Sequence, residues 1–205
     1  MARIKISAAH RDFTAELNSL IRLDSINQSN TGLSKGQLEL LTEGVFLSAF
    51  RAYENYVEEV FILYTLEKNG LSGFKPKSYL KPRSYNHSRD LIRSSMPFLD
   101  WSNPESVMER ASIYLSSGEP LRTAIAGANR DLQDMKTLRN QIAHNSKESK
   151  IKYAKLLRRE YGTAPLNIPS PGRHLLKTAP GRSPTEHYLA FYINTLLSVG
   201  VAIAA

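Results

Sequence analysis

A short segment, Arg139 to His144, brings an arginine, an amide and a histidine close together in the chain. Arginine presents a planar fork that matches phosphate oxygens, and histidine titrates near neutral pH. These groups could bind an RNA phosphate and move protons beside it. Neutral His144 would deprotonate a ribose 2′-hydroxyl for attack on the adjacent phosphate, and protonated His144 would protonate the leaving 5′-oxygen. Arg139 would stabilise charge on the phosphoryl oxygens, and Asn140 would orient the histidine or the phosphate.

Such a reaction leaves a 2′,3′-cyclic phosphate and requires neither a metal ion nor another cofactor. The chain shows no clustered carboxylates suited to holding a metal ion, so we expect no metal site. One histidine cannot act as base and as acid in the same step. The other histidines, which lack a similar setting, are His10, His87, His174 and His187. A two-fold homodimer would bring two copies of His144 to one cleft, and the need for two proton-transfer groups therefore favours a paired site.

Helical geometry limits how these side chains meet. Asn140 and His144 are four residues apart and share one helix face. Arg139 is five residues from His144, which places the two about 140° apart around an ideal helix. They converge only if the helix ends or distorts near His144, for which Asn145 and Ser146 are suitable, or if the arginine side chain wraps around the helix.

The element that must support this segment is a long helix predicted over residues 37–68. Ser34 and Gln37 have the spacing of a capping box, and Asn69 with Gly70 favours an end there. Two apolar stripes run along it at helical spacing. The first is Leu38, Leu41, Val45, Ala49, Ala52, Tyr56, Val60 and Leu63, and the second is Phe46, Phe50, Tyr53, Val57, Phe61 and Tyr64. So wide an apolar face must be buried against several neighbours, either in the same chain or in a second subunit.

The rest of the chain also has helical patterns. Helices are expected over residues 8–26, 87–96, 104–115, 121–145 and 147–161, with loops over 71–83 and 162–184. Ser183 to Glu186 has the form of a capping box that begins a last, apolar helix. No segment alternates apolar and polar residues. We therefore expect an all-α helical bundle forming a single domain over 1–205, with a proline-rich loop at 162–184.

Composition narrows the class of protein. At 41% hydrophobic and 22% charged residues, the chain is typical of a folded globular protein. The absence of cysteine excludes disulfides, thiolate metal sites and a cysteine nucleophile. Met1 to Ser7 lacks the apolar core of a secretory signal, so a cytoplasmic location is expected. Tyr188 to Ala205 is uncharged and lies at the lower length limit for crossing a membrane, but a buried helix is favoured over a tail anchor.

The net charge of +8 is concentrated in two segments. Residues 75–93 hold six Lys/Arg and one acid, and residues 147–182 hold nine Lys/Arg and two acids. Two basic segments in an otherwise acidic chain indicate a polyanionic partner, and RNA fits the chemistry of the Arg139 segment. The predicted RNA-binding residues are Lys147, Lys150, Lys152, Lys155, Arg158 and Arg159. Tyrosines placed to stack on bases are Tyr79, Tyr85, Tyr153 and Tyr161.

The chain resembles the HEPN superfamily of small all-α domains, whose signature is an arginine and a histidine with four to six residues between them. Arg139 and His144, with four residues between them, fit this signature, and Asn140 is a frequent companion. The string Arg-Asn-x-Ile-Ala-His on a late helix is similar to bacterial RiboL-PSP-type and related HEPN groups. These groups also have an aromatic and glutamate pair on an earlier long helix, like Tyr53 and Glu54. The resemblance covers residues 40–66 and 132–146.

This resemblance implies a metal-independent endoribonuclease, often a homodimer with its signature residues at the subunit interface. Relatives commonly act as toxins or antiviral-defence effectors, so a cognate antitoxin or another defence-system protein is an expected partner. Arg139 and His144 carry over as catalytic residues with Asn140, and Glu54 carries over as a supporting residue that orients them.

Two alternatives stay open. The first is a non-catalytic RNA-binding or scaffolding HEPN module, which would use the same basic segments and tyrosines. The second is a structural or regulatory partner, such as an antitoxin-like helical protein that assembles through the wide apolar stripe. A nuclease should lose cleavage and keep RNA binding when His144 is replaced, whereas a binding module should be indifferent to that change.

Overall fold

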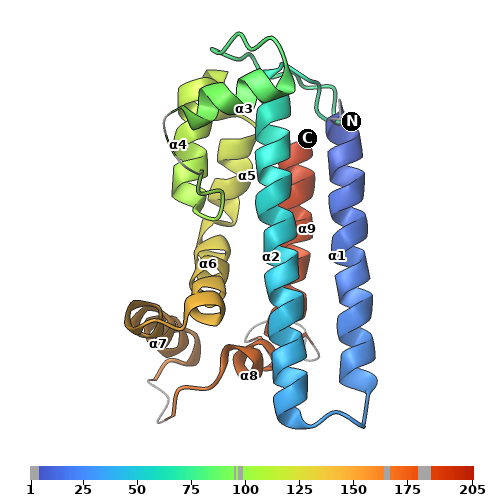
Figure 1. Ribbon diagram of the computed structural model, residues 1–205, viewed down its shortest axis with the longest axis vertical. Helices are drawn as coiled ribbons and strands as arrows, with labels where there is room; N and C mark the ends of the chain where they lie inside the picture. Colours follow the sequence, from blue (N-terminus) through green and yellow to red (C-terminus); the bar gives the residue numbers. More distant parts are fainter. Residues whose placement is uncertain (1–4, 95, 97–98, 164–166, 180–185) are drawn as a thin grey trace.

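The structure is a computed structural model that describes residues 5–94, 96, 99–163, 167–179 and 186–205. Across these residues the chain is all-α, with nine α-helices, one 3-10 turn and no strand beyond two isolated bridges (Figure 1). The prediction of an all-α bundle is confirmed. The elements are α1 (Ile6–Ser29), α2 (Lys35–Thr65), α3 (Tyr85–Arg93), α4 (Pro104–Tyr114), η1 (Ser116–Gly118), α5 (Leu121–Gly127), α6 (Asn129–His144), α7 (Lys147–Tyr161), α8 (Pro171–Leu175) and α9 (Tyr188–Ala204).

Helix α2 is the centre of the fold. Its predicted capping box is confirmed, because the Ser34 hydroxyl accepts a hydrogen bond from the Gln37 N–H and the Gln37 side chain accepts one from the Ser34 N–H. The helix ends at Thr65, four residues before the predicted end at Asn69. Both apolar stripes are mostly buried, against α1, α9, α8, α3 and α6 of the same chain. The breadth of the apolar face therefore reflects its several intramolecular neighbours.

Three helices meet at one closely packed point in the long bundle of α1, α2 and α9 (Figure 1). The Phe13 ring stacks on the Tyr56 ring with 4.3 Å between centroids. The Tyr56 hydroxyl donates a hydrogen bond to the Gly200 carbonyl at 2.8 Å. A Cβ on Gly200 would lie 2.5 Å from the Phe13 ring, so only glycine permits this approach of α1 to α9.

The C-terminal apolar segment is a buried helix of the bundle, as predicted. Its start differs from the prediction: α9 begins at Tyr188, and the His187 side chain is its N-cap, accepting from the Ala190 N–H. Ser183, Pro184 and Thr185 of the predicted capping box lie outside the described residues. Within the described part of the chain, none of the helices is both long enough and apolar enough to span a membrane.

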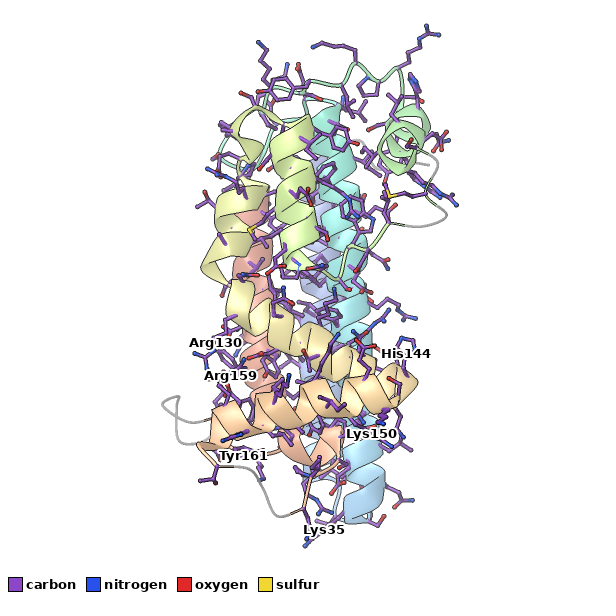
Figure 2. The ribbon with its side chains drawn as sticks, turned by 90° about the vertical axis from the view of Figure 1, so that its left-hand side faces the viewer. Lys35, Arg130, His144, Lys150, Arg159 and Tyr161 are labelled. Atoms are coloured by element: carbon purple, nitrogen blue, oxygen red, sulfur yellow. The ribbon has the colours of Figure 1, made fainter. Side chains whose placement is uncertain are left out.

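The prediction of a single helix over 121–145 is wrong in one respect, because the structure has two helices there. Gly127 ends α5, and Ala128 has non-helical backbone angles before α6 begins. The break allows the two halves to pack on different partners: α5 contacts α4 and α9, whereas α6 contacts α7 and α2. Helices α6 and α7 then form an antiparallel hairpin across the lower half of the bundle (Figure 2).

The predicted loop over 162–184 contains a short helix, α8, which contradicts the prediction that the whole segment is a loop. Ser170 caps this helix and Pro171 occupies its first position. It packs so closely on α2 that a Cβ on Gly172 would lie 2.3 Å from the Glu39 carbonyl oxygen. The Gly172 N–H also donates to the Glu43 carboxylate at 2.8 Å.

Candidate active site between α2 and α6

The end of α6 brings Arg139 and His144 together. Asn145 adopts the left-handed conformation, with φ 44° and ψ 34°, and Ser146 caps α7 immediately afterwards. His144 is thus the last residue of its helix, and the ideal angle of about 140° between the two side chains is bridged by the arginine. Arg139 Nη1 lies 3.5 Å from His144 Nε2 and donates to Asn140 Oδ1 at 3.1 Å. The three signature side chains therefore form one cluster.

Glu54 of α2 faces this cluster. Its Oε1 lies 4.0 Å from Arg139 Nη2, and its side chain is only 20% exposed. Burial raises the pKa of Glu54, while Arg139 acts in the opposite direction and Asp100 reinforces the rise. Among the described residues the Glu54 carboxylate makes no hydrogen bond, so Arg139 is its nearest compensating charge. Glu54 is placed to restrain the guanidinium next to His144.

A hollow of about 270 Å³ opens beside these residues, between α2 and the end of α6. Its polar wall comes from Arg51, Glu54, Arg139 and His144, and its remaining lining is Leu47, Ser48 and Ala143. Arg51 and His144 are exposed. The hollow, which we call the signature hollow, therefore presents two guanidinium groups and an imidazole to solvent, a set that can bind a phosphate and exchange protons with its neighbours.

A second hollow of about 330 Å³ lies on the other side of Arg139, also between α2 and α6. We call it the Glu58 hollow. Its lining is Glu54, Asn55, Glu58, Leu99, Asp100, Trp101, Ser102, Lys136, Arg139 and Asn140. Because Glu54 and Arg139 line both hollows, the two are neighbours along a single path beside α2.

Two basic residues of this path were missed by the reasoning from sequence. Arg51 precedes Glu54 by three residues, and Lys136 precedes Arg139 by three residues, so each shares a helix face with a predicted site residue. That spacing was the available signal. Many other cations in the chain have the same spacing. Which of them face the groove depends on how α6 packs against α2, and this packing cannot be read from the sequence.

The predicted RNA-binding residues of α7 do not share one environment. All six cations are exposed. Lys150 lies at the same end of the α6–α7 hairpin as His144, whereas Arg159 lies at the opposite end, close to Arg130 (Figure 2). Lys152 pairs with Glu148 one turn earlier on α7, at 2.6 Å. The structure therefore brings the first part of α7 to the signature residues, and not the last part.

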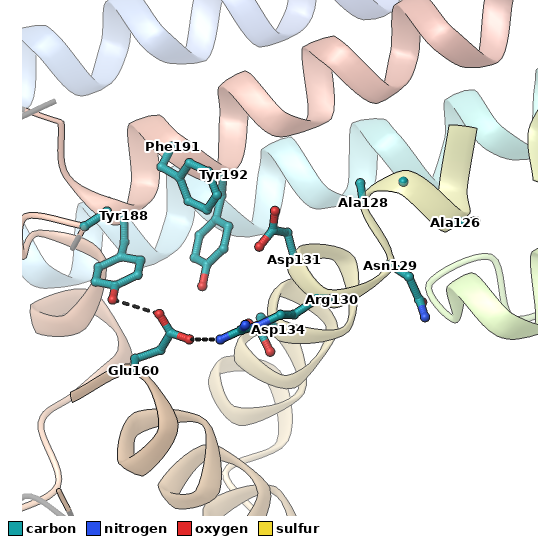
Figure 3. Close-up of a pocket in the computed structure, with 12 residues that line it drawn as sticks. Ala126, Ala128, Asn129, Arg130, Asp131, Asp134, Glu160, Tyr188, Phe191 and Tyr192 are labelled. Atoms are coloured by element: carbon teal, nitrogen blue, oxygen red, sulfur yellow. Dashed lines mark hydrogen bonds and ion pairs between the residues drawn. The ribbon is translucent and has the colours of Figure 1, made fainter. Parts of the chain in front are cut away.

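Arg159 is exposed, but its guanidinium is held by acidic side chains of the same chain. It forms an ion pair with Asp134, whose side chain is only 8% exposed, and a second with Glu160 at 3.2 Å. Burial raises the pKa of Asp134, and the Arg159 guanidinium opposes this rise. Glu160 also accepts from Tyr188 and pairs with Arg130, at the edge of a hollow of about 430 Å³ between α6, α7 and α9 (Figure 3). These contacts fasten α7 to α6 and α9, far from His144.

The tyrosines proposed for stacking also differ from one another. Tyr153 is buried, and its hydroxyl donates to the Ser170 carbonyl, so its ring is not available to a base. Tyr161 is half-buried beside His174, with its hydroxyl 2.7 Å from His174 Nδ1. Tyr79 is 60% exposed.

The two basic segments lie near opposite ends of α2, with α3 at one end and α7 at the other (Figure 1).

In the part of the chain that the structure describes, no group of three or more His, Asp or Glu side chains is arranged to hold a metal ion. Comparison of the chain with protein-family models, with curated proteins and with solved structures gave no match. The candidate site therefore rests on its own geometry.

Proposed function

We propose that this chain is a HEPN-like, metal-independent endoribonuclease that cleaves RNA by 2′-hydroxyl attack and leaves a 2′,3′-cyclic phosphate. The single observation that carries the proposal is the contact between Arg139 and His144. Their spacing in an ideal helix keeps them apart, yet the helix end and the arginine side chain bring Nη1 and Nε2 to 3.5 Å. An imidazole next to a guanidinium in an exposed hollow supplies one proton-transfer group and one phosphate-binding group for this reaction.

The geometry supports the following roles. Arg139 and Arg51 would bind the phosphate and stabilise the charge of its transition state. His144 would transfer the proton, since its ring is exposed at the mouth of the signature hollow. Glu54 would hold Arg139 in place across the groove, and Asn140, which accepts from Arg139, would fix the guanidinium from the other side.

A second copy of the chain would supply the second proton-transfer group. Leu40, Gly44, Leu47 and Arg51 follow one another along a single face of α2 that leads to the signature hollow. Leu40 is 69% exposed, and the space around Gly44 is open. An exposed leucine and a glycine allow another helix to approach closely, and this face would place two copies of His144 near a shared substrate.

The dimer is tested by Leu40→Glu, because a carboxylate on this face would be buried without a partner in the dimer. We expect the variant to run as a monomer in size-exclusion chromatography with light scattering, and its RNA cleavage to fall at least tenfold. Ile113→Glu, an equally non-conservative change of an exposed residue on α4, is the control and should change neither property. A fully active Leu40→Glu monomer would remove the second copy from the mechanism.

The exposed cations near His144 should contribute to RNA affinity through the phosphate backbone. Replacing Lys147 and Lys150 together by glutamate is expected to weaken RNA binding and to make the salt dependence of log K shallower, by about 0.7 for each lost single-strand contact. Fluorescence anisotropy of a labelled single-stranded RNA over a salt series measures both. Arg22→Glu on α1, also exposed, is the control. If the slope of log K against log salt is unchanged in the double variant, Lys147 and Lys150 of α7 do not contact the RNA backbone.

The reaction itself is tested by incubating the wild-type protein with a defined single-stranded RNA in EDTA and analysing the new 3′ ends. The proposal requires fragments that end in 2′,3′-cyclic phosphate. The opposite result would be no cleavage in EDTA, no cleavage with added divalent cations, and retained RNA binding. That result would favour the alternative, a non-catalytic RNA-binding or scaffolding HEPN module. The exposed cations of α7 would serve that module equally well.

In the cell, we propose that the nuclease acts in the cytoplasm as a toxin or antiviral-defence effector. A cognate antitoxin or another defence protein would restrain it.

A further inference from the structure

The Glu58 hollow has two chemically different sides. On α2, Glu58 is one turn beyond Glu54 and faces the same hollow. Its carboxylate is one-third exposed, and its closest described partner is Arg89, at 4.0 Å from Glu58 Oε1, which is longer than a hydrogen bond. Glu58 therefore still has acceptor capacity within the hollow.

Donors lie on the α6 side of the same hollow. Lys136 is 21% exposed and contacts Asp100 at 3.3 Å. Asp100 is already satisfied, because its Oδ1 accepts from the Ser102 N–H at 2.9 Å and its Oδ2 faces Lys136. An ammonium has three donors, so Lys136 keeps donors for a further partner. The hollow thus offers an acceptor on α2 opposite a donor on α6.

This pairing matches one nucleobase. A carboxylate binds best where two donors stand side by side, and guanine presents N1–H and N2–H together on its Watson–Crick edge. Adenine and cytosine place an acceptor next to their amino group, and uracil places its single N–H between two carbonyls. Guanine also has acceptors at O6 and N7, which suit a lysine. Single-stranded bases are read in this way on their exposed edges.

We propose that the Glu58 hollow is a guanine-binding subsite next to the scissile phosphate, with Glu58 as the residue that determines specificity. The volume of about 330 Å³ falls within the range of small-ligand pockets. Arg139 lines both this hollow and the signature hollow, so a phosphate on Arg139 is adjacent to a base in the Glu58 hollow. The subsite rests on the proposed ribonuclease function, but its binding can be measured separately from cleavage.

The binding test uses the His144→Ala protein, so that RNA stays intact. Five-residue single-stranded RNAs that differ only at the central base, guanine, inosine or adenine, are compared by fluorescence anisotropy. Inosine lacks the N2 amino group and so removes one of the two donors to Glu58. A hydrogen bond to a charged group corresponds to about tenfold or more in affinity, so the guanine strand should bind about tenfold tighter than the inosine strand.

Adding Glu58→Gln to this protein should reduce the guanine preference to less than threefold, since the amide replaces one of the two acceptor oxygens with an N–H donor. Glu16→Gln, an exposed glutamate on α1 with the same change of charge, should leave the preference intact. The same comparison by cleavage, in proteins that keep His144, should show cuts next to guanine that lose their base preference in Glu58→Gln.

The outcomes separate the two proposals. Guanine-selective binding that depends on Glu58, without cleavage by the wild type, supports the subsite and overturns the nuclease. Cleavage with equal use of all bases supports the nuclease and overturns the subsite. A guanine preference unchanged in Glu58→Gln overturns Glu58 as the residue that determines specificity, whether or not the wild type cleaves RNA. Circular-dichroism melting of each variant establishes that the comparison is made between folded proteins.

Discussion

His144→Ala is expected to lower the rate of RNA cleavage by about 10²–10⁴-fold, the range that a positioned general acid or base contributes. His144 is the only histidine in the described lining of the signature hollow, and we assign the proton transfer to its imidazole. Because His144 is exposed at the end of α6, its loss should not disturb the core. RNA affinity should change less than threefold, since Arg139 and Arg51 remain.

Single-turnover cleavage of a labelled RNA in EDTA measures this effect, with anisotropy reporting the affinity. His87→Ala, which removes a histidine from the other basic segment, is the matched control and should retain the wild-type rate. Arg139→Lys adds a second comparison. This variant keeps the positive charge but loses the planar guanidinium, so we expect its cleavage rate to fall at least tenfold. Cleavage by His144→Ala at the wild-type rate would end the proposed mechanism.

Acidification below pH 6.5 is expected to destabilise the folded protein through His174. This side chain is fully buried against the rings of Tyr153, Tyr161 and Tyr188, and burial lowers its pKa from 6.5 to about 4. Glu160 acts in the opposite direction and Lys177 in the same direction, both more weakly than burial. The folded state therefore holds His174 neutral where the unfolded chain would protonate it.

The sign follows from proton linkage. A lowered pKa in the folded state contributes stability that is fully present above the unfolded pKa of 6.5 and is lost as the pH falls towards about 4. The full effect is about 3 kcal/mol, of which about 2 kcal/mol is lost by pH 5. Other groups titrate in this window, so the informative quantity is the difference between wild type and a variant that has no histidine at this position.

Urea unfolding at pH 7 and pH 5 of wild type, His174→Gln and His174→Phe measures that difference. Glutamine keeps an acceptor for the Tyr161 hydroxyl, and phenylalanine keeps the ring, so at least one folded variant is expected. Each should lose about 2 kcal/mol less than wild type between the two pH values. Equal losses in all three proteins would mean that His174 does not carry the acid sensitivity.

Local patterns predicted the helices well where the information is local. The capping box at Ser34, the proline that begins α4 at Pro104 and the break at Asn145 were all readable, because each depends on backbone groups within a few residues. The break at Ala128 was missed, although Gly127 was a signal, because an apolar pattern continued across it. The helix at Pro171 was missed because a run of prolines and glycines usually indicates a loop.

The site divides in the same way. The sequence by itself determined that the fold is helical, that Arg139, Asn140 and His144 belong to one segment, and that cations follow them. Only the tertiary structure decided that Arg139 reaches His144, that Glu54 faces Arg139, and that Arg51 and Lys136 join the groove while Arg159 pairs with Asp134. Sequence spacing fixes neighbours along one helix, whereas contacts between helices depend on how their apolar faces pack, and that packing is a property of the whole core.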